Sequence, residues 1–89
     1  MVSQKVRIKN PSGLHLRPAG NLCKEALRYQ SKVELLYREN ESNAKSVLSV
    51  LGACVKCGDE VEFRCTGPDE EEALRAVISL AEDGFGEEE

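Results

Sequence analysis

The sequence predicts an α+β fold, a two-layer sandwich in which helices cover one face of a sheet. Two observations support this prediction. Segments that alternate polar and apolar residues, typical of strands with one buried face, are interspersed with segments whose apolar residues have helical spacing. The predicted order is strand, helix, strand, strand, helix, strand, helix. Because the chain has 89 residues, we expect a single domain, residues 1–89, with one modest core.

The first half of the chain predicts a strand, a helix and then two strands. Residues 5–9 alternate polar and apolar, and turn residues follow them. Residues 18–29 predict an amphipathic helix, because apolar residues recur at positions i, i+3, i+4, i+7 and i+8. The expected buried face of this helix consists of Ala19, Leu22, Cys23, Ala26 and Leu27. Residues 32–37 alternate again, and after a turn a short strand is expected to run to Ala44.

The second half predicts a short helix, a strand and a long helix. Ser46 to Gly52 is expected to form two helical turns, with the serine as the N-cap and the glycine closing the helix. Residues 61–66 alternate and predict the last strand. Asp69 is expected to cap the final helix, whose buried stripe consists of Ala73, Leu74, Val77, Leu80 and Ala81. Gly84 is expected to end this helix, and residues 86–89 to form a frayed acidic tail.

Composition and charge limit the classes of function. No apolar run is long enough to cross a membrane, and no signal-peptide core is present, so we expect a cytoplasmic protein with reduced cysteines. Residues 1–30 carry six basic residues against one acidic residue, whereas residues 59–89 carry twelve acidic residues against two arginines. The basic end therefore favours acidic protein partners. Nucleic acid is not an expected direct partner, because aromatic residues make up only 4%.

The basic end also contains the only histidine, His15, directly before the first predicted helix. An imidazole is a nucleophile near neutral pH, although a lone histidine at such a place is usually a surface cap. The free N–H groups and positive dipole of a helix N-terminus suit a phosphate, and here residues 16–18 would form the cradle. Arg17 adds a guanidinium that suits phosphate oxygens. The combination suggests a histidine that carries a phosphoryl group.

Three motifs carry a resemblance to a known family. They are Gly13-Leu14-His15-x-Arg17-Pro18-Ala19, the segment 43–46 with Gly58-Asp59-Glu60 after it, and Gly67-Pro68-Asp69-Glu70-Glu71. From Val6 to Phe85 the chain resembles HPr, the histidine-containing phosphocarrier family of the bacterial phosphoenolpyruvate-dependent sugar phosphotransferase system. The resemblance implies an antiparallel four-stranded sheet in the order 1-4-2-3 with three helices.

The resemblance also implies a function. His15 would take a phosphoryl group on Nδ1 from phospho-enzyme I and pass it to sugar-specific enzyme IIA domains, with Arg17 as the phosphate clamp. Such a protein is a stoichiometric carrier and not an enzyme, and it needs no cofactor and no metal. The family's partner-docking surface would correspond to Lys24, Arg28, Lys45, Val47, Leu48 and Leu51. Of the short helix, Val47 and either Val50 or Leu51 are expected in the core, and Leu48 is expected to be exposed.

Ser46 is a second candidate site besides its role as an N-cap. In the HPr proteins of many Gram-positive bacteria the matching serine is phosphorylated by HPr kinase/phosphorylase. The resemblance therefore implies regulation at Ser46, with that kinase and a catabolite-control transcription regulator as further partners. A phosphate there would place negative charge on a surface meant for acidic partners.

Several alternatives stay open. Leu16 stands where the family usually has a small residue, and some nitrogen-related paralogues carry leucine there, so a non-sugar phosphorelay is the second candidate. A regulatory HPr-like module is a third, although such members lack the histidine. Cys54-x-x-Cys57 could form a redox pair or half of a zinc site, whereas Cys23 and Cys65 are expected to be buried. We expect a monomer, because no large apolar stripe is left over.

Overall fold

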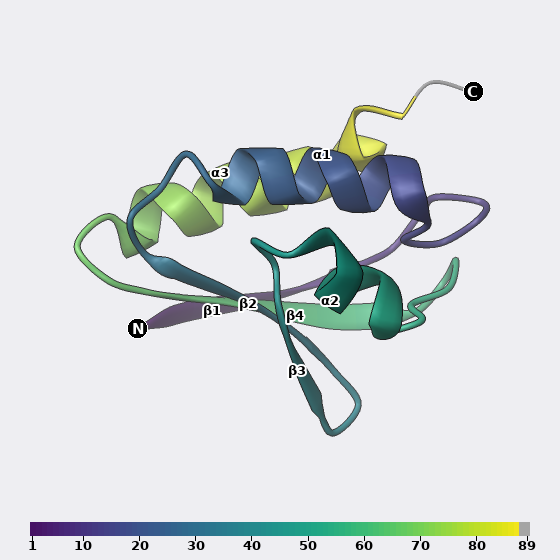
Figure 1. Ribbon diagram of the computed structural model, residues 1–89, viewed down its shortest axis with the longest axis horizontal. Helices are drawn as coiled ribbons and strands as arrows, with labels where there is room; N and C mark the ends of the chain where they lie inside the picture. The colour runs from purple at the N-terminus through teal and green to yellow at the C-terminus, as the bar shows by residue number, and fades with distance from the viewer. Residues whose placement is uncertain (88–89) are drawn as a thin grey trace.

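The structure is a computed structural model and describes residues 1–87. It has two layers, with helices on one face of an antiparallel sheet (Figure 1). The strands are β1 (Val2–Arg7), β2 (Lys32–Tyr37), β3 (Asn40–Asn43) and β4 (Glu60–Thr66). The helices are α1 (Leu16–Ala26), α2 (Val47–Gly52) and α3 (Glu70–Glu82), followed by the 3₁₀ turn η1 (Gly84–Gly86). The sheet order β1-β4-β2-β3 confirms the predicted fold class and strand order.

The core lies between the sheet and helices α1 and α3. Alternate residues of β2 and β4, such as Val33 and Phe63, point into it, as the period of two along a strand requires. Leu22 of α1 and Val77 of α3 meet them from the other side and are fully buried. Each such side chain contributes roughly 1.5–3 kcal/mol by leaving water.

Strand β1 and helix α1 differ from the sequence prediction at both of their ends, since residues 5–9 and 18–29 were expected. Strand β1 begins at Val2, because its ladder with β4 extends from the pair Val2–Cys65 to the pair Arg7–Glu60. Helix α1 begins at Leu16 and ends at Ala26. Leu27 is therefore 62% exposed, and its assignment to the buried face was wrong. The helix stops there because the chain must turn back to enter β2.

Helix α2 ends at Gly52, as predicted, but without a left-handed glycine after its last turn. Gly52 is the last residue of that helix, and Ala53 after it keeps a right-handed helical backbone. The left-handed residue comes later, at Cys54, with a φ of 57°. Among the described helices none is long and apolar enough to cross a membrane.

Asp69 precedes α3 as predicted, but its side chain does not cap that helix. Instead, its carboxylate accepts hydrogen bonds from the Ser31 hydroxyl at 2.5 Å and from the backbone N–H groups of Ser31 and Gln30 at 2.9 and 3.0 Å. These hydrogen bonds, from the Ser31 hydroxyl first, hold the pKa of Asp69 below its usual value. Asp69 thus joins the turn after α1 to the turn before α3.

Replacing Asp69 by asparagine should lower the stability of the fold at neutral pH and reduce its dependence on pH. Since the pKa of Asp69 is lower in the folded state than in the unfolded chain, ionisation stabilises the fold above about pH 4, and this contribution is lost as the pH falls below that value. Urea midpoints of both proteins at about pH 7 and about pH 3 would measure it. A stability difference that stays constant across this range would contradict the assignment.

Candidate functional site

His15 is the N-cap residue of α1 and lies at one end of the helical layer. Its backbone is extended, with φ −78° and ψ −169°, and its carbonyl accepts the first helical hydrogen bond from Ala19 at 3.0 Å. The imidazole is 40% exposed. Leu16 and Arg17 therefore occupy the first turn, where backbone N–H groups have no partner inside the helix. Pro18 has no N–H to offer, so only two residues of the predicted cradle supply donors.

The backbone just before His15 is held against the loop that follows α2. The N–H of Leu14 donates to the carbonyl of Val55 at 3.1 Å, and the N–H of Gly13 donates to the carbonyl of Asn10 at 2.8 Å. Gly13 has a φ of +67°, and a Cβ at this position would lie 2.3 Å from the Val55 oxygen. Only glycine fits this approach, which explains its place in the motif on physical grounds.

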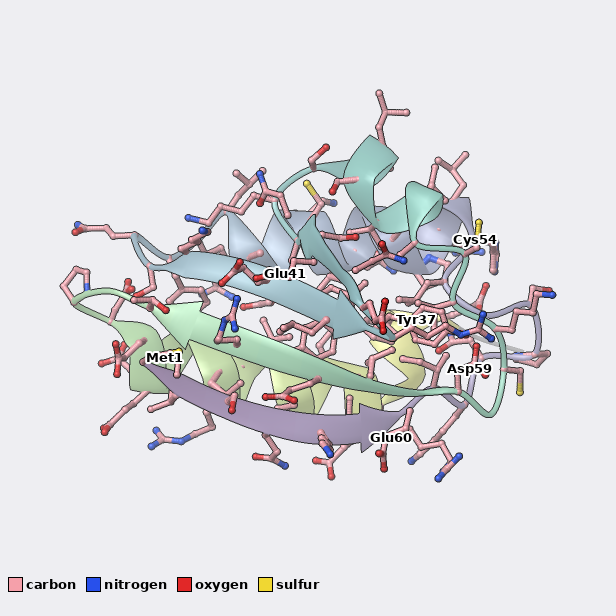
Figure 2. All side chains as sticks on the ribbon, turned by 90° about the horizontal axis from the view of Figure 1, so that it is seen from below. Met1, Tyr37, Glu41, Cys54, Asp59 and Glu60 are labelled. Atoms are coloured by element: carbon pink, nitrogen blue, oxygen red, sulfur yellow. The ribbon has the colours of Figure 1, made fainter. Side chains whose placement is uncertain are left out.

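Asp59 in turn holds the loop that carries Val55. Its carboxylate accepts hydrogen bonds from the Tyr37 hydroxyl at 2.6 Å and from the N–H of Lys56 at 2.9 Å. The Tyr37 bond, followed by the Lys56 bond, lowers the pKa of Asp59. Figure 2 shows Tyr37 and Asp59 at the same end of the molecule as Cys54, with Met1 at the opposite end. Hydrogen bonds at Asp59 and Val55 therefore connect the end of β2 to Leu14, the residue before His15.

The C-terminal segment supplies a residue that sequence analysis missed. A side-chain oxygen of Glu87 lies 2.6 Å from Nε2 of His15, and the other oxygen accepts a hydrogen bond from Asn10 at 2.8 Å. The prediction of a frayed tail over 86–89 was therefore wrong for Gly86 and Glu87, and residues 88–89 lie outside the described residues. The only hint in the sequence was an apolar residue, Phe85, directly after the end of a helix.

The predicted docking residues have different surroundings. Leu48 is 81% exposed and Val50 is buried, as expected, while Val47 and Leu51 are partly buried against the core. The ammonium of Lys45 donates to the carbonyl of Tyr29 at 2.7 Å. Lys24, Arg28 and Arg17 are exposed, and Arg28 pairs with Glu25 at 3.2 Å. Leu16 is 68% exposed and adds apolar surface directly beside His15.

Ser46 is the N-cap of α2, as predicted. Its hydroxyl accepts a hydrogen bond from the N–H of Ser49 at 3.2 Å, and its side chain is partly exposed. The serine thus has a structural role that accounts for its presence without any modification.

The cysteines divide as the sequence predicted. Cys23 and Cys65 are buried, and burial raises the pKa of the Cys65 thiol to about 11, so this thiol is inert. Cys54 and Cys57 are exposed free thiols. Within residues 1–87 no three histidine, cysteine, aspartate or glutamate side chains gather as a metal site would require.

Comparison with known proteins identifies the family. The family model described as "PTS HPr component phosphorylation site" matches residues 2–83. The chain belongs to the HPr family. It is 40% identical to the phosphocarrier protein HPr of Treponema pallidum, over 99% of this chain and 100% of the relative. It is 41% identical to the phosphocarrier protein NPr of Escherichia coli, over 98% of both chains.

A solved structure agrees with this assignment. A crystal structure of HPr-C-His from Thermoanaerobacter tengcongensis superposes with a TM-score of 0.94 at 36% identity, over 100% of both chains. The chain is therefore a phosphocarrier of the HPr and NPr type in a phosphotransferase system. Proteins of this family carry a phosphoryl group and are not catalysts.

Gly13→Ala should destabilise the protein and displace His15. The left-handed backbone alone costs alanine about 1–3 kcal/mol, and contact with Val55 adds to this. Gly20→Ala is the matched control, because Gly20 lies inside α1 and a Cβ there meets nothing within 4 Å. That control should be neutral or stabilising by up to about 1 kcal/mol. Urea unfolding and backbone NMR shifts around His15 would compare the two, and equal effects would refute the close-approach argument.

Proposed function

We propose that this protein accepts a phosphoryl group on Nδ1 of His15 from phospho-enzyme I and passes it to an enzyme IIA domain, in the cytoplasm. The observation that carries the proposal is the placement of an accessible imidazole at the N-terminus of α1, directly beside the unused N–H groups of Leu16 and Arg17. These donors and the helix dipole suit the oxygens of a phosphoryl group.

The transfer step needs only groups of this chain and of the donor. The lone pair of Nδ1 on neutral His15 attacks phosphorus as the bond from phosphorus to the donor histidine breaks. The electron pair of that bond stays on the donor imidazole. The phosphoryl oxygens are then held by the N–H groups of the first helical turn, with the Arg17 guanidinium adding positive charge. Transfer to enzyme IIA repeats the step with this protein as the donor.

Incubation with phosphoenolpyruvate and enzyme I should place one acid-labile phosphate on the wild type and none on His15→Ala. His15 is not part of the hydrophobic core, so the variant should still fold, and thermal unfolding serves as the control. Mass spectrometry and acid treatment would locate the phosphate. The proposal fails if His15→Ala is still labelled, or if the wild type stays unlabelled beside an HPr that the same enzyme I labels.

A nitrogen-related relay is the second candidate. It is supported by the near-equal identities to HPr of T. pallidum and NPr of E. coli, and by the exposed Leu16 next to His15. The labelling experiment separates the two when it is run with enzyme I of the sugar system and with its nitrogen-related paralogue. The protein belongs to the relay whose enzyme I phosphorylates it with the higher kcat/KM.

We infer regulation at Ser46 from the position of its hydroxyl on a partly exposed helix start, two residues from the exposed Leu48. HPr kinase/phosphorylase would be the modifying enzyme, and a catabolite-control transcription regulator the further partner. A phosphate at Ser46 adds charge of roughly −1.5 to −2 to the surface that acidic partners must approach. This would slow transfer from enzyme I and favour regulatory partners.

Ser46→Asp should reduce kcat/KM for phosphorylation by enzyme I by about tenfold, since like charges oppose each other at the docking surface. Ser3→Asp is the matched control, because Ser3 is exposed on β1 and adds the same charge elsewhere. Initial rates at low ionic strength would measure the effect. Equal rates for the two variants would exclude an electrostatic role of Ser46.

A further inference from the structure

We propose that Glu87 is a positioning residue for phosphoryl transfer: its carboxylate accepts the Nε2 proton of His15 in a hydrogen bond and so leaves the Nδ1 lone pair free to attack. This inference rests on the proposed function, because it concerns the same histidine. It adds a residue from the C-terminal segment, outside the three motifs and outside residues 2–83 that the family model matches.

Both oxygens of the Glu87 carboxylate have a hydrogen-bond partner. Glu87 Oε2 lies 2.6 Å from His15 Nε2, while Glu87 Oε1 accepts a hydrogen bond from Asn10 Nδ2 at 2.8 Å. The Glu87 side chain is only 14% exposed, although it lies near the end of the chain. The bond from Asn10, and after it the bond to His15, lower the pKa of Glu87, so the carboxylate is ionised at neutral pH.

Asn10 is oriented by this arrangement. The residue is buried, and its amide nitrogen donates both to Glu87 and to the carbonyl of Gly84 at 2.8 Å. Its own Oδ1 has no partner among the described residues. Both N–H groups of this buried amide bind the same C-terminal segment, so that segment sets the orientation of the amide. Asn10 therefore fixes the C-terminal turn and Glu87 together.

The backbone after α3 brings Glu87 back to the histidine. Gly84, Phe85 and Gly86 all have left-handed φ values, of 71°, 56° and 71°. Phe85 is fully buried, and its carbonyl accepts a hydrogen bond from Asn21 of α1 at 2.7 Å. The turn η1 consequently lies against α1 (Figure 1). A non-glycine residue adopts a left-handed backbone only where packing offsets the strain, and the burial of Phe85 does so here.

The hydrogen bond selects the reactive tautomer. An ionised carboxylate can only accept, so neutral His15 carries its proton on Nε2 and has the lone pair on Nδ1. When Nδ1 forms its bond to phosphorus, the ring keeps the Nε2 proton and becomes positively charged. The Glu87 carboxylate stabilises that charge as it develops, on the side of the ring away from the incoming phosphoryl group.

The experiment uses the full chain and compares Glu87→Ala, Glu87→Gln and the control Glu82→Gln. Glu82 is exposed on the last turn of α3, so the control removes the same charge without touching His15. We expect kcat for phosphorylation by enzyme I to fall about tenfold in Glu87→Ala. In metal sites, loss of the partner that orients a ligating histidine lowers affinity or activity about 10- to 100-fold, and the expected effect is the lower end of that range. Glu87→Gln keeps an acceptor oxygen and should lie between that variant and the wild type. KM should not change, because the docking surface stays intact.

Nitrogen and proton NMR of the His15 imidazole would supply a readout that a structural role does not move. The wild type should show a slowly exchanging, low-field Nε2 proton that Glu87→Ala lacks and Glu82→Gln retains. Unchanged kcat in both Glu87 variants, a faster rate in either, or absence of that proton signal from the wild type would overturn the inference. Failure of the proposed function is distinguishable, because the wild type itself would then stay unphosphorylated.

Discussion

The close approach of Gly13 and Leu14 to the loop at Val55 is the constraint on which the rest of the site depends. One hydrogen bond of 3.1 Å and the missing Cβ of Gly13 bring the strand-to-helix connection within van der Waals contact of that loop. The connection must then turn sharply, and His15 enters α1 with an extended backbone as its N-cap. Exposure of the imidazole and the free N–H groups beside it both follow from this entry, because a helix that started earlier would use those groups internally.

The charges are distributed differently on the folded protein than along the sequence. The chain is basic at its start and acidic at its end, which on its own favours acidic partners at the basic face. In the fold, the acidic end returns to the basic face through η1 and places Glu87 on the histidine. Arg17 and His15 both lower the pKa of that carboxylate after Asn10 does. The fold thus places the mostly buried carboxylate of Glu87 beside His15 and Arg17.

The sequence predicts the architecture well because each strand and helix repeats its own period over several residues. The alternation of β2 and β4 and the stripe of α3 follow directly from that repetition. Predictions from single residues were weaker. Asp69 has the position of a helix cap, yet its carboxylate binds Ser31, since only the fold brings the two turns together. Glu87 could not be found from sequence, because its partner lies 72 residues away and the turn between them needs left-handed backbone at Phe85.

A carrier differs from an enzyme in that it must release what it has accepted, and the proposed roles of these groups divide accordingly. Donors at the helix start and Arg17 act on the phosphoryl oxygens, whose negative charge they would stabilise. Glu87 acts on the ring, where positive charge appears only as the new bond forms. In the proposed role the same carboxylate serves both steps, because the ring gains its positive charge when the bond to phosphorus forms and loses it when that bond breaks during transfer to the next protein.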